Sequence, residues 1–125
     1  MVIKRSASNY SDTVRSLLAA IERRGLTVFA RIDHAAAARE VGMELAEEEV
    51  VLFGNPRAGT PLMLSDRQVG IELPLRILIW REGAEAMLAH HDPRDLNGAY
   101  DLAEHQSTLE QMAMLLEQLT IEAAS

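Results

Sequence analysis

The segment from Ile71 to His91 constrains the fold more than any other part of the chain. Its first part, IELPLRILIW, alternates with the two-residue period of a β-strand. REGAEA then has the composition of a turn, and AMLAHH returns as a second strand. Strands joined by so short a connection pair antiparallel, so the segment predicts an antiparallel sheet. One face of the first strand carries Leu73, Leu75, Ile77 and Ile79, and the other carries Glu72, Pro74, Arg76, Leu78 and Trp80.

Helices and strands alternate along the rest of the chain. A helix capped by Ser11 or Asp12 and ended by Gly25 carries an apolar stripe of Val14, Leu17, Leu18 and Ile21. Strands are predicted at residues 2–3, at 26–32 and in EEEVVLF, and a short alanine-rich helix runs from its cap, Asp33, to Gly42. A long amphipathic helix covers about residues 104–121. This order predicts a single α+β domain over residues 1–125, an antiparallel sheet with helices packed on it.

Composition excludes several classes of protein. The chain has no cysteine, so it forms no disulfide and no thiolate metal site. The net charge is −7, the acidic excess lies in residues 63–125, and Lys4 is the sole lysine, so we expect no nucleic acid partner. The apolar runs are too short to cross a bilayer and the N-terminus lacks the apolar centre of a signal peptide. We therefore expect a cytoplasmic protein without a membrane partner.

Four stretches together resemble a known family. FARIDHAAAAREVG, FGNPRAGTPLM, LPLRILIW and HDP occur in the order and spacing of the bacterial family called domain of unknown function 302, over about residues 26–100. The resemblance implies a fold like one repeat of the TATA-binding protein, and a dimer. It implies no activity. Where the family pattern places an aromatic residue before HDP, this chain has His90, and a pocket at that position would be more polar.

The stretch FGNPRAGTPLM contains two pairs of a helix-capping residue and proline. Since Pro61 would break a helix begun at Pro56, we predict a turn at Asn55-Pro56 and a short helix over residues 61–66 that begins at Thr60-Pro61. The corner at Gly59-Thr60 would then expose free backbone N–H groups beside Arg57, a site for a carboxylate or a phosphate. The alternative is a purely structural connection, in which Gly54 and Gly59 supply positive φ angles.

The histidines and acidic residues give weaker signals. His90 and His91 point to opposite faces of a strand and cannot both bind one ion, so we predict no metal site. Asp33 is expected to cap a helix whose first turn holds His34. No nucleophile elbow or phosphate-binding glycine loop is present, and we predict no cofactor and assign no catalytic residue.

Two surfaces could form a homodimer. Leu78 and Trp80 make one strand apolar on both faces, so either a helix covers them or they lie at an interface. Met112, Met114 and Leu115 widen the apolar face of the last helix in the same way. Packing of that helix on Trp80 within the monomer remains open, but the family resemblance favours a homodimer.

Three hypotheses for function follow. The first is a dimeric binding or accessory module for a small anionic or amphipathic molecule, with these candidate ligand-binding residues: His34, Asn55, Arg57, Gly59, Thr60, His91 and Asp92. The second is a hydrolase- or isomerase-like enzyme that uses His34, His91 or Asp92 as acid or base. The third is a domain whose partners are all proteins. The absence of a catalytic signature favours a protein that is not an enzyme.

Overall fold

The computed structural model describes residues 1–125 and contains one five-stranded sheet with the strand order β1-β5-β4-β3-β2. Every neighbouring pair of strands is antiparallel. The strands are β1 (Val2–Arg5), β2 (Thr27–Asp33), β3 (Glu48–Gly54), β4 (Leu75–Glu82) and β5 (Glu85–His90). The predicted α+β fold and the antiparallel hairpin between β4 and β5 are confirmed.

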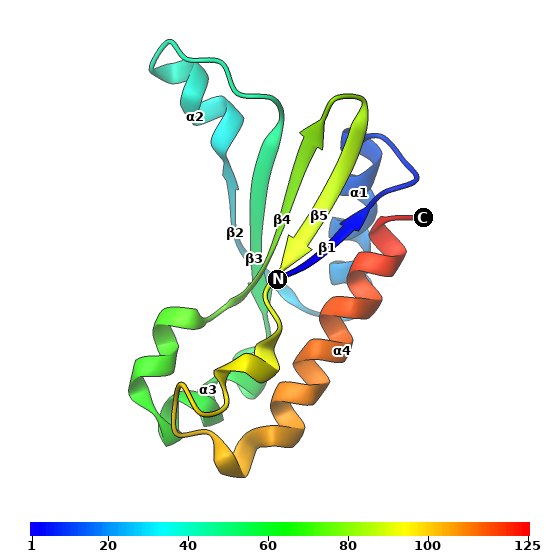
Figure 1. Cartoon of the computed structure of the whole chain (residues 1–125). Helices are drawn as coiled ribbons and strands as arrows, with labels where there is room; N and C mark the ends of the chain where they lie inside the picture. The colour runs from blue at the N-terminus through cyan, green and yellow to red at the C-terminus, as the bar shows by residue number, and fades with distance from the viewer.

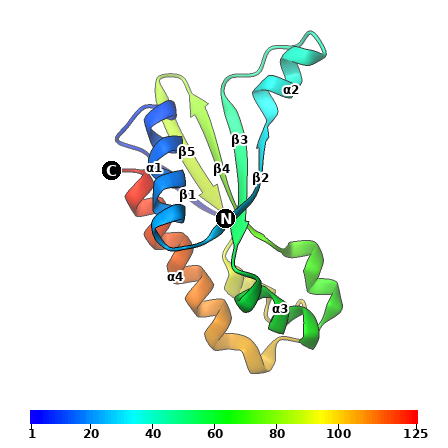
Figure 2. The same ribbon diagram turned by 180° about the vertical axis from the view of Figure 1, so that it is seen from behind.

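The chain also forms four α-helices: α1 (Tyr10–Arg23), α2 (His34–Glu40), α3 (Pro56–Ser65) and α4 (Gln106–Ala123). Short 3₁₀ helices cover Arg67–Glu72, Pro93–Leu96 and Ala103–His105. Helices α1 and α4 lie side by side on one face of the sheet, whereas α2 projects beyond the end of β2 and β3 (Figures 1 and 2). None of the helices combines the length and apolarity needed to span a membrane.

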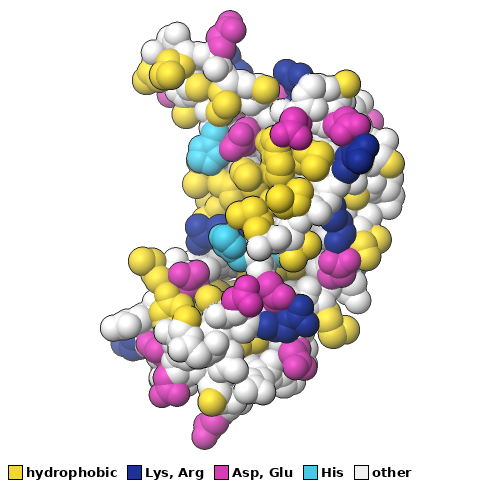
Figure 3. Space-filling view, in the orientation of Figure 1, with side chains coloured by type: hydrophobic (Ala, Val, Ile, Leu, Met, Phe, Trp, Pro, Cys, Tyr) yellow, Lys and Arg dark blue, Asp and Glu magenta, His cyan; other side chains and the backbone are white.

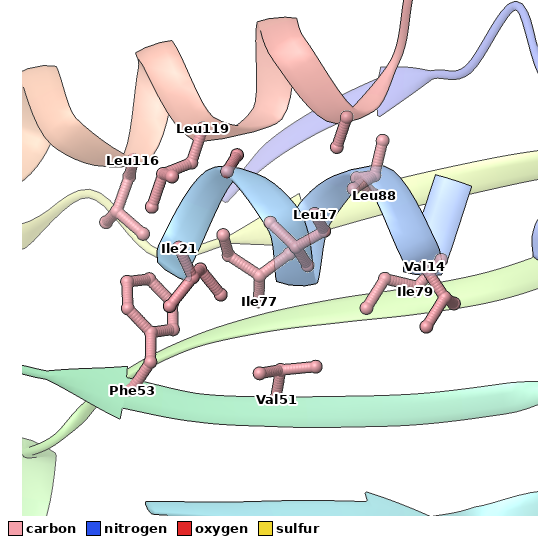
Figure 4. Packing of buried hydrophobic residues seen from close by; sticks show 12 residues of the cluster. Val14, Leu17, Ile21, Val51, Phe53, Ile77, Ile79, Leu88, Leu116 and Leu119 are labelled. Atoms are coloured by element: carbon pink, nitrogen blue, oxygen red, sulfur yellow. The ribbon is translucent and has the colours of Figure 1, made fainter. Parts of the chain in front are cut away.

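The main core lies between the sheet and the pair α1 and α4 (Figure 4). The period-two pattern of the strands and the helical stripe of α1 converge here, since both place their apolar residues on the same side. The buried side chains include Val14, Leu17, Ile21, Val51, Phe53, Ile77, Ile79, Leu88, Leu116 and Leu119. A second, smaller core joins α3, the following 3₁₀ helix and the first half of α4 through Leu62, Val69, Leu102, Leu109 and Met112.

The opposite face of the sheet carries no helix. Leu78 and Trp80 lie on it, because their neighbours Ile77 and Ile79 point into the core. Apolar side chains gather over this side of the molecule (Figure 3). The last helix therefore packs on α1 and the core instead of covering Trp80.

Two boundaries differ from the sequence expectation. The first helix begins at Tyr10 and is capped by Asn9, whose side chain accepts a hydrogen bond from the Asp12 N–H. Residues 71 and 72 belong to a 3₁₀ helix, so the strand begins at Leu75 and not with the alternating pattern at Ile71.

The prediction for FGNPRAGTPLM is wrong in one decisive respect. Helix α3 begins at Pro56 with Asn55 as its cap, so Thr60 and Pro61 lie inside it. Pro61 removes one helical hydrogen bond, that to the carbonyl of Arg57. The cap, the favourable first-position proline and the complete burial of Leu62 outweigh that loss.

Gly59 therefore occupies a helix interior without a positive φ angle. A Cβ at this position would meet the Leu73 side chain at 3.7 Å, an ordinary contact. We expect Gly59→Ala to raise the free energy of unfolding by about 0.8–1 kcal/mol, because glycine is the poorer helix former. Calorimetry should show a higher melting temperature, and a lower one would contradict the helical assignment.

Ion pairs attach the second half of α4 to its neighbours. Lys4 on β1 pairs with Glu117 at 2.7 Å. Glu122 pairs with Arg24 at 2.6 Å and with Arg23 at 2.9 Å. The hydrogen bond from Arg24, aided by Arg23, lowers the pKa of Glu122 from 4.5 to about 2.

This pKa shift predicts a pH dependence of stability. The Glu122 contribution is fully present above pH 4.5 and is lost as the pH falls toward 2, because protonation removes the negative charge that pairs with both arginines. Urea unfolding should show wild type more stable than Glu122→Gln at pH 7, with the difference vanishing toward pH 2. Glu110→Gln, an exposed change on the same helix outside any ion pair, is the control. A pH-independent difference for Glu122→Gln would contradict the pairing.

Candidate functional site

A cavity of about 450 Å³ lies between α3, α4 and the adjoining end of the sheet. We call it the α3–α4 cavity. Its polar lining side chains are Asn55, Thr60, Thr108 and Gln111, and every other lining residue is apolar or glycine. No charged side chain lines it.

Two of the sequence motifs build the walls of this cavity. FGNPRAGTPLM supplies the end of β3 and α3, which place Gly54, Asn55 and Gly59 on one side. The residues that lead into β4, Leu73 to Leu75, form the next wall, and α4 closes the space with Met112 and Leu115 among others. Phe29, which lies at a register shift in β2, completes the lining.

The first turn of α3 offers no free backbone donor. Pro56 has no N–H, and the Arg57 N–H donates to the Asn55 side chain at 2.9 Å. The N–H groups of Ala58 and Gly59 both donate to the Asn55 carbonyl, at 2.9 and 3.2 Å. The predicted corner at Gly59-Thr60 is therefore wrong, because the amides that would have held an anion are already paired.

Arg57 also departs from the expected geometry. Its side chain is exposed and does not line the cavity, whereas Asn55, Gly59 and Thr60 do. The hydrogen-bonding groups that face the cavity are thus neutral amides and hydroxyls. Such a lining suits an uncharged, mostly apolar molecule that carries one or two hydrogen-bonding groups.

His91 and Asp92 lie at a second, smaller cavity of about 280 Å³. Its other charged lining residues are Glu72 and Arg76, and it shares the walls Leu73 and Leu75 with the α3–α4 cavity.

The Asp92 carboxylate is already engaged. It caps the 3₁₀ helix that follows, where it accepts a hydrogen bond from the Arg94 N–H at 3.0 Å. It also pairs with the Arg94 guanidinium at 2.6 Å. The side-chain hydrogen bond from Arg94 lowers the pKa of Asp92. A carboxylate held ionised in this way is a weak proton acceptor.

The remaining histidines do not join either cavity. His34 is exposed at the start of α2, where Asp33 caps the helix by accepting from the Ala36 N–H at 2.8 Å. His90 is buried, its Nδ1 lies 2.7 Å from the His91 carbonyl oxygen, and its Nε2 has no partner. The polar pocket expected at His90 is not found, since His90 lines neither cavity. No imidazole is hydrogen-bonded to a carboxylate.

Sequence reasoning missed most of the lining of the α3–α4 cavity. Phe29, Leu73 and the pair Thr108 and Gln111 come from three separate segments, and no local pattern joins them. LPLRILIW contained a usable signal, because it is the next family motif along the chain after the turn-rich motif that forms the opposite wall. The sequence gives no sign that α4 lines the cavity, since Thr108 and Gln111 fall on the polar part of the helical pattern.

Comparison with known proteins extends the resemblance beyond residues 26–100. Over 94 residues, which are 74% of this chain, the sequence is 37% identical to the fluoride-specific ion channel FluC 1 of Brucella suis biovar 1. The identity and the extent are the same for the fluoride-specific ion channel FluC 2 of Brucella melitensis biotype 1. The match covers 37% and 35% of those proteins, so the chain spans little more than a third of their length.

A solved structure supports the fold. The crystal structure of an uncharacterized conserved DUF302 protein from Bacillus stearothermophilus superposes with a TM-score of 0.75. The superposition covers 98% of this chain and 94% of that one at 15% sequence identity, which shows a common fold. The model of the family "Domain of unknown function DUF302" matches residues 2–119. The chain therefore belongs to the DUF302 family.

Proposed function

We propose that this protein is a small binding or accessory module that holds a neutral, mostly apolar molecule in the α3–α4 cavity. The observation that carries the proposal is the cavity of about 450 Å³ with its charge-free lining. Its volume falls in the range of ligand pockets, roughly 300–1,000 Å³, and its few polar groups could orient a ligand. The sequence suggests either an anionic or an amphipathic ligand, and the charge-free lining favours an uncharged amphipathic one.

The polar groups of the cavity are available to a ligand. Thr60, Thr108 and Gln111 make no side-chain hydrogen bond within the protein, and Asn55 uses only its carbonyl oxygen, for the cap of α3. An apolar molecule would gain by leaving water, at roughly 25 cal/mol per Å² of apolar surface buried. The hydroxyls and amides would satisfy its polar end.

The relatives support an accessory role. In the two Brucella proteins the matched region is about a third of a chain that bears the name of an ion channel. A module that occurs within larger proteins is suited to bind a small molecule beside another activity.

The proposal predicts that filling the cavity weakens binding. Thr108→Trp should weaken binding of the neutral apolar dye Nile red at least about tenfold, because the indole occupies the space the dye needs. The neighbouring Ser107 is exposed and does not line the cavity, so Ser107→Trp is a matched control. Fluorescence titration measures both affinities. Equal affinities in the two variants would place the dye elsewhere and overturn the proposed site.

A second measurement tests the charge preference. In competition with Nile red, 1-dodecanol should displace the dye at lower concentration than dodecanoate, which must bring a carboxylate to a lining without a cation. Tighter binding of dodecanoate would contradict the assignment of an uncharged ligand. Native mass spectrometry of protein purified from its source would then identify the class of any retained molecule.

We also propose that the module is a homodimer through the sheet face that carries Leu78 and Trp80. The apolar side of α4 packs on α1 and the core, which leaves only Met114 and Ile121 prominent on its exposed side. The sheet face, by contrast, is apolar over several strands and has no helix on it (Figure 3). Large apolar surfaces of this kind commonly mark interfaces.

A further inference from the structure

The second cavity, of about 280 Å³, lies where β4 begins and where the chain leaves β5. Four of its ten lining residues can carry a charge: Glu72, Arg76, His91 and Asp92. The other six are apolar: Ile71, Leu73, Leu75, Pro93, Leu96 and Leu116. This cavity therefore combines charged groups with apolar walls, which the α3–α4 cavity does not.

The charge of Asp92 is compensated within the protein. Both oxygens of its carboxylate accept hydrogen bonds from the Arg94 guanidinium, the shortest at 2.6 Å. Arg94 does not itself line the cavity, so the pair contributes a wall without a net charge. Asp92 therefore leaves no charge for a ligand to balance.

Glu72 carries a negative charge that no cation of the protein balances. Its carboxylate takes part in no ion pair and accepts a hydrogen bond from the Tyr100 hydroxyl at 3.1 Å. A neutral phenol orients a carboxylate but does not neutralise it. Tyr100 in turn packs against the second core, so the Glu72 carboxylate is held in place at the cavity.

Arg76 carries the opposite uncompensated charge. It lies on β4 opposite Leu52, and its guanidinium takes part in no ion pair. Arg76 and Glu72 line the same cavity, yet they do not pair with each other. The cavity thus presents one free positive charge and one free negative charge on separate parts of its wall.

We propose that the second cavity binds a small zwitterion with an apolar side chain, the chemistry of a free apolar α-amino acid. The Arg76 guanidinium donates to the ligand carboxylate, a pairing that the planar fork of arginine favours. The Glu72 carboxylate accepts from the ligand ammonium group. The volume lies near the lower end of the range for ligand pockets, roughly 300–1,000 Å³, and suits a molecule of this size.

The apolar walls provide for the side chain of the ligand. Ile71 is 79% exposed although it lines the cavity, so its side chain now lies largely in water. An apolar group bound against Ile71 and Leu96 would remove apolar surface of both partners from water. A ligand with both charges and an apolar side chain therefore uses every part of the lining.

Ligands with a single charge are the competing class. A monocarboxylate would pair with Arg76 but would bring its charge near Glu72, and a monoamine would pair with Glu72 but approach Arg76. Each would leave one lining charge without a partner and next to a charge of its own sign. For this reason we prefer the zwitterion.

The first test compares three ligands that share one apolar group. L-leucine carries both charges, 4-methylpentanoate lacks the ammonium group and isopentylamine lacks the carboxylate. Isothermal titration calorimetry of the full chain measures each affinity. Because Glu72 and Arg76 are exposed, water weakens both ion pairs, so the titrations extend to millimolar ligand. We expect each single-charge ligand to bind at least about tenfold more weakly than L-leucine.

Charge-removing variants assign the two roles. Arg76→Gln should weaken binding of L-leucine at least about tenfold, and Glu72→Gln should do the same while keeping an acceptor for Tyr100. Arg67→Gln and Glu104→Gln are the matched controls, because both residues are exposed, take part in no ion pair and do not line this cavity. Circular dichroism melts establish that each variant is folded. If one is not, the ligand series on wild type still decides.

Each outcome decides the proposal. No binding of L-leucine at millimolar concentration would overturn it, and so would equal binding of 4-methylpentanoate or isopentylamine. Unchanged affinity in Arg76→Gln and Glu72→Gln would place L-leucine elsewhere. Glycine bound as tightly as L-leucine would overturn the role of the apolar walls. Thr108→Trp lies outside this cavity and should leave L-leucine binding intact, so the second cavity and the α3–α4 cavity are judged separately.

Discussion

Phe53→Ala is expected to lower the free energy of unfolding by about 3–5 kcal/mol. Phe53 is fully buried at the end of β3 and packs beside Ile21 and Leu116 (Figure 4). Alanine would leave a cavity between the sheet and both covering helices, where neighbouring side chains can collapse only in part. Urea unfolding followed by circular dichroism measures the loss.

The chain's other phenylalanine provides the control. Phe29 is 51% exposed in β2, so Phe29→Ala should cost less than about 1 kcal/mol. The two variants delete the same atoms from neighbouring strands and differ in burial. Similar losses for both would contradict the packing described for the end of β3.

The second large effect concerns the ion pair between Arg31 and Glu49. The Arg31 Nε and Nη2 donate to the two Glu49 carboxylate oxygens at 3.0 and 3.2 Å. The Glu49 side chain is 8% exposed and that of Arg31 is 48% exposed. Arg31→Met keeps the apolar stem but leaves the buried carboxylate without a donor. We expect a loss of about 2 kcal/mol, below the roughly 3–5 kcal/mol for a fully buried pair, because water reaches the guanidinium.

A compensating change tests the cause of this loss. In the Arg31→Met background, Glu49→Leu replaces the stranded carboxylate by an apolar side chain and should recover most of the stability. Chemical denaturation of the single and double variants gives the comparison. A double variant less stable than Arg31→Met would show that packing around Glu49, and not its unpaired charge, sets the cost.

Elements with local signals were predictable from the sequence. The β4–β5 hairpin follows from alternation and a turn, and the start of α2 follows from Asp33 as a cap. The extent of helix α3 was not predictable, because whether the helix runs through Pro61 depends on contacts with residues distant in sequence. Burial of Leu62 among Val69, Leu102 and Leu109 favours a helix that runs through Pro61 against its local preference.

The candidate site was less predictable than the fold. FGNPRAGTPLM borders a cavity, but Asn55 accepts hydrogen bonds from the amides that the sequence predicts to be free. Thr108 and Gln111 reach the same cavity only because α4 packs beside α3 in three dimensions. Apolar residues on both sides of β4 were compatible with a covering helix or with an interface, and the path of α4 along α1 shows that this helix does not cover Trp80.

The strand order has a consequence for how the chain folds. Strands β2 to β5 each pair with the next strand in sequence, so the connections that join them are much shorter than the chain between β1 and β5. Strand β1 instead joins β5, with Val2 opposite His90, and its Lys4 is tied to Glu117. Closing so long a loop is entropically costly, and we expect the N-terminal strand to dock late, after α4 has formed, and to limit the folding rate.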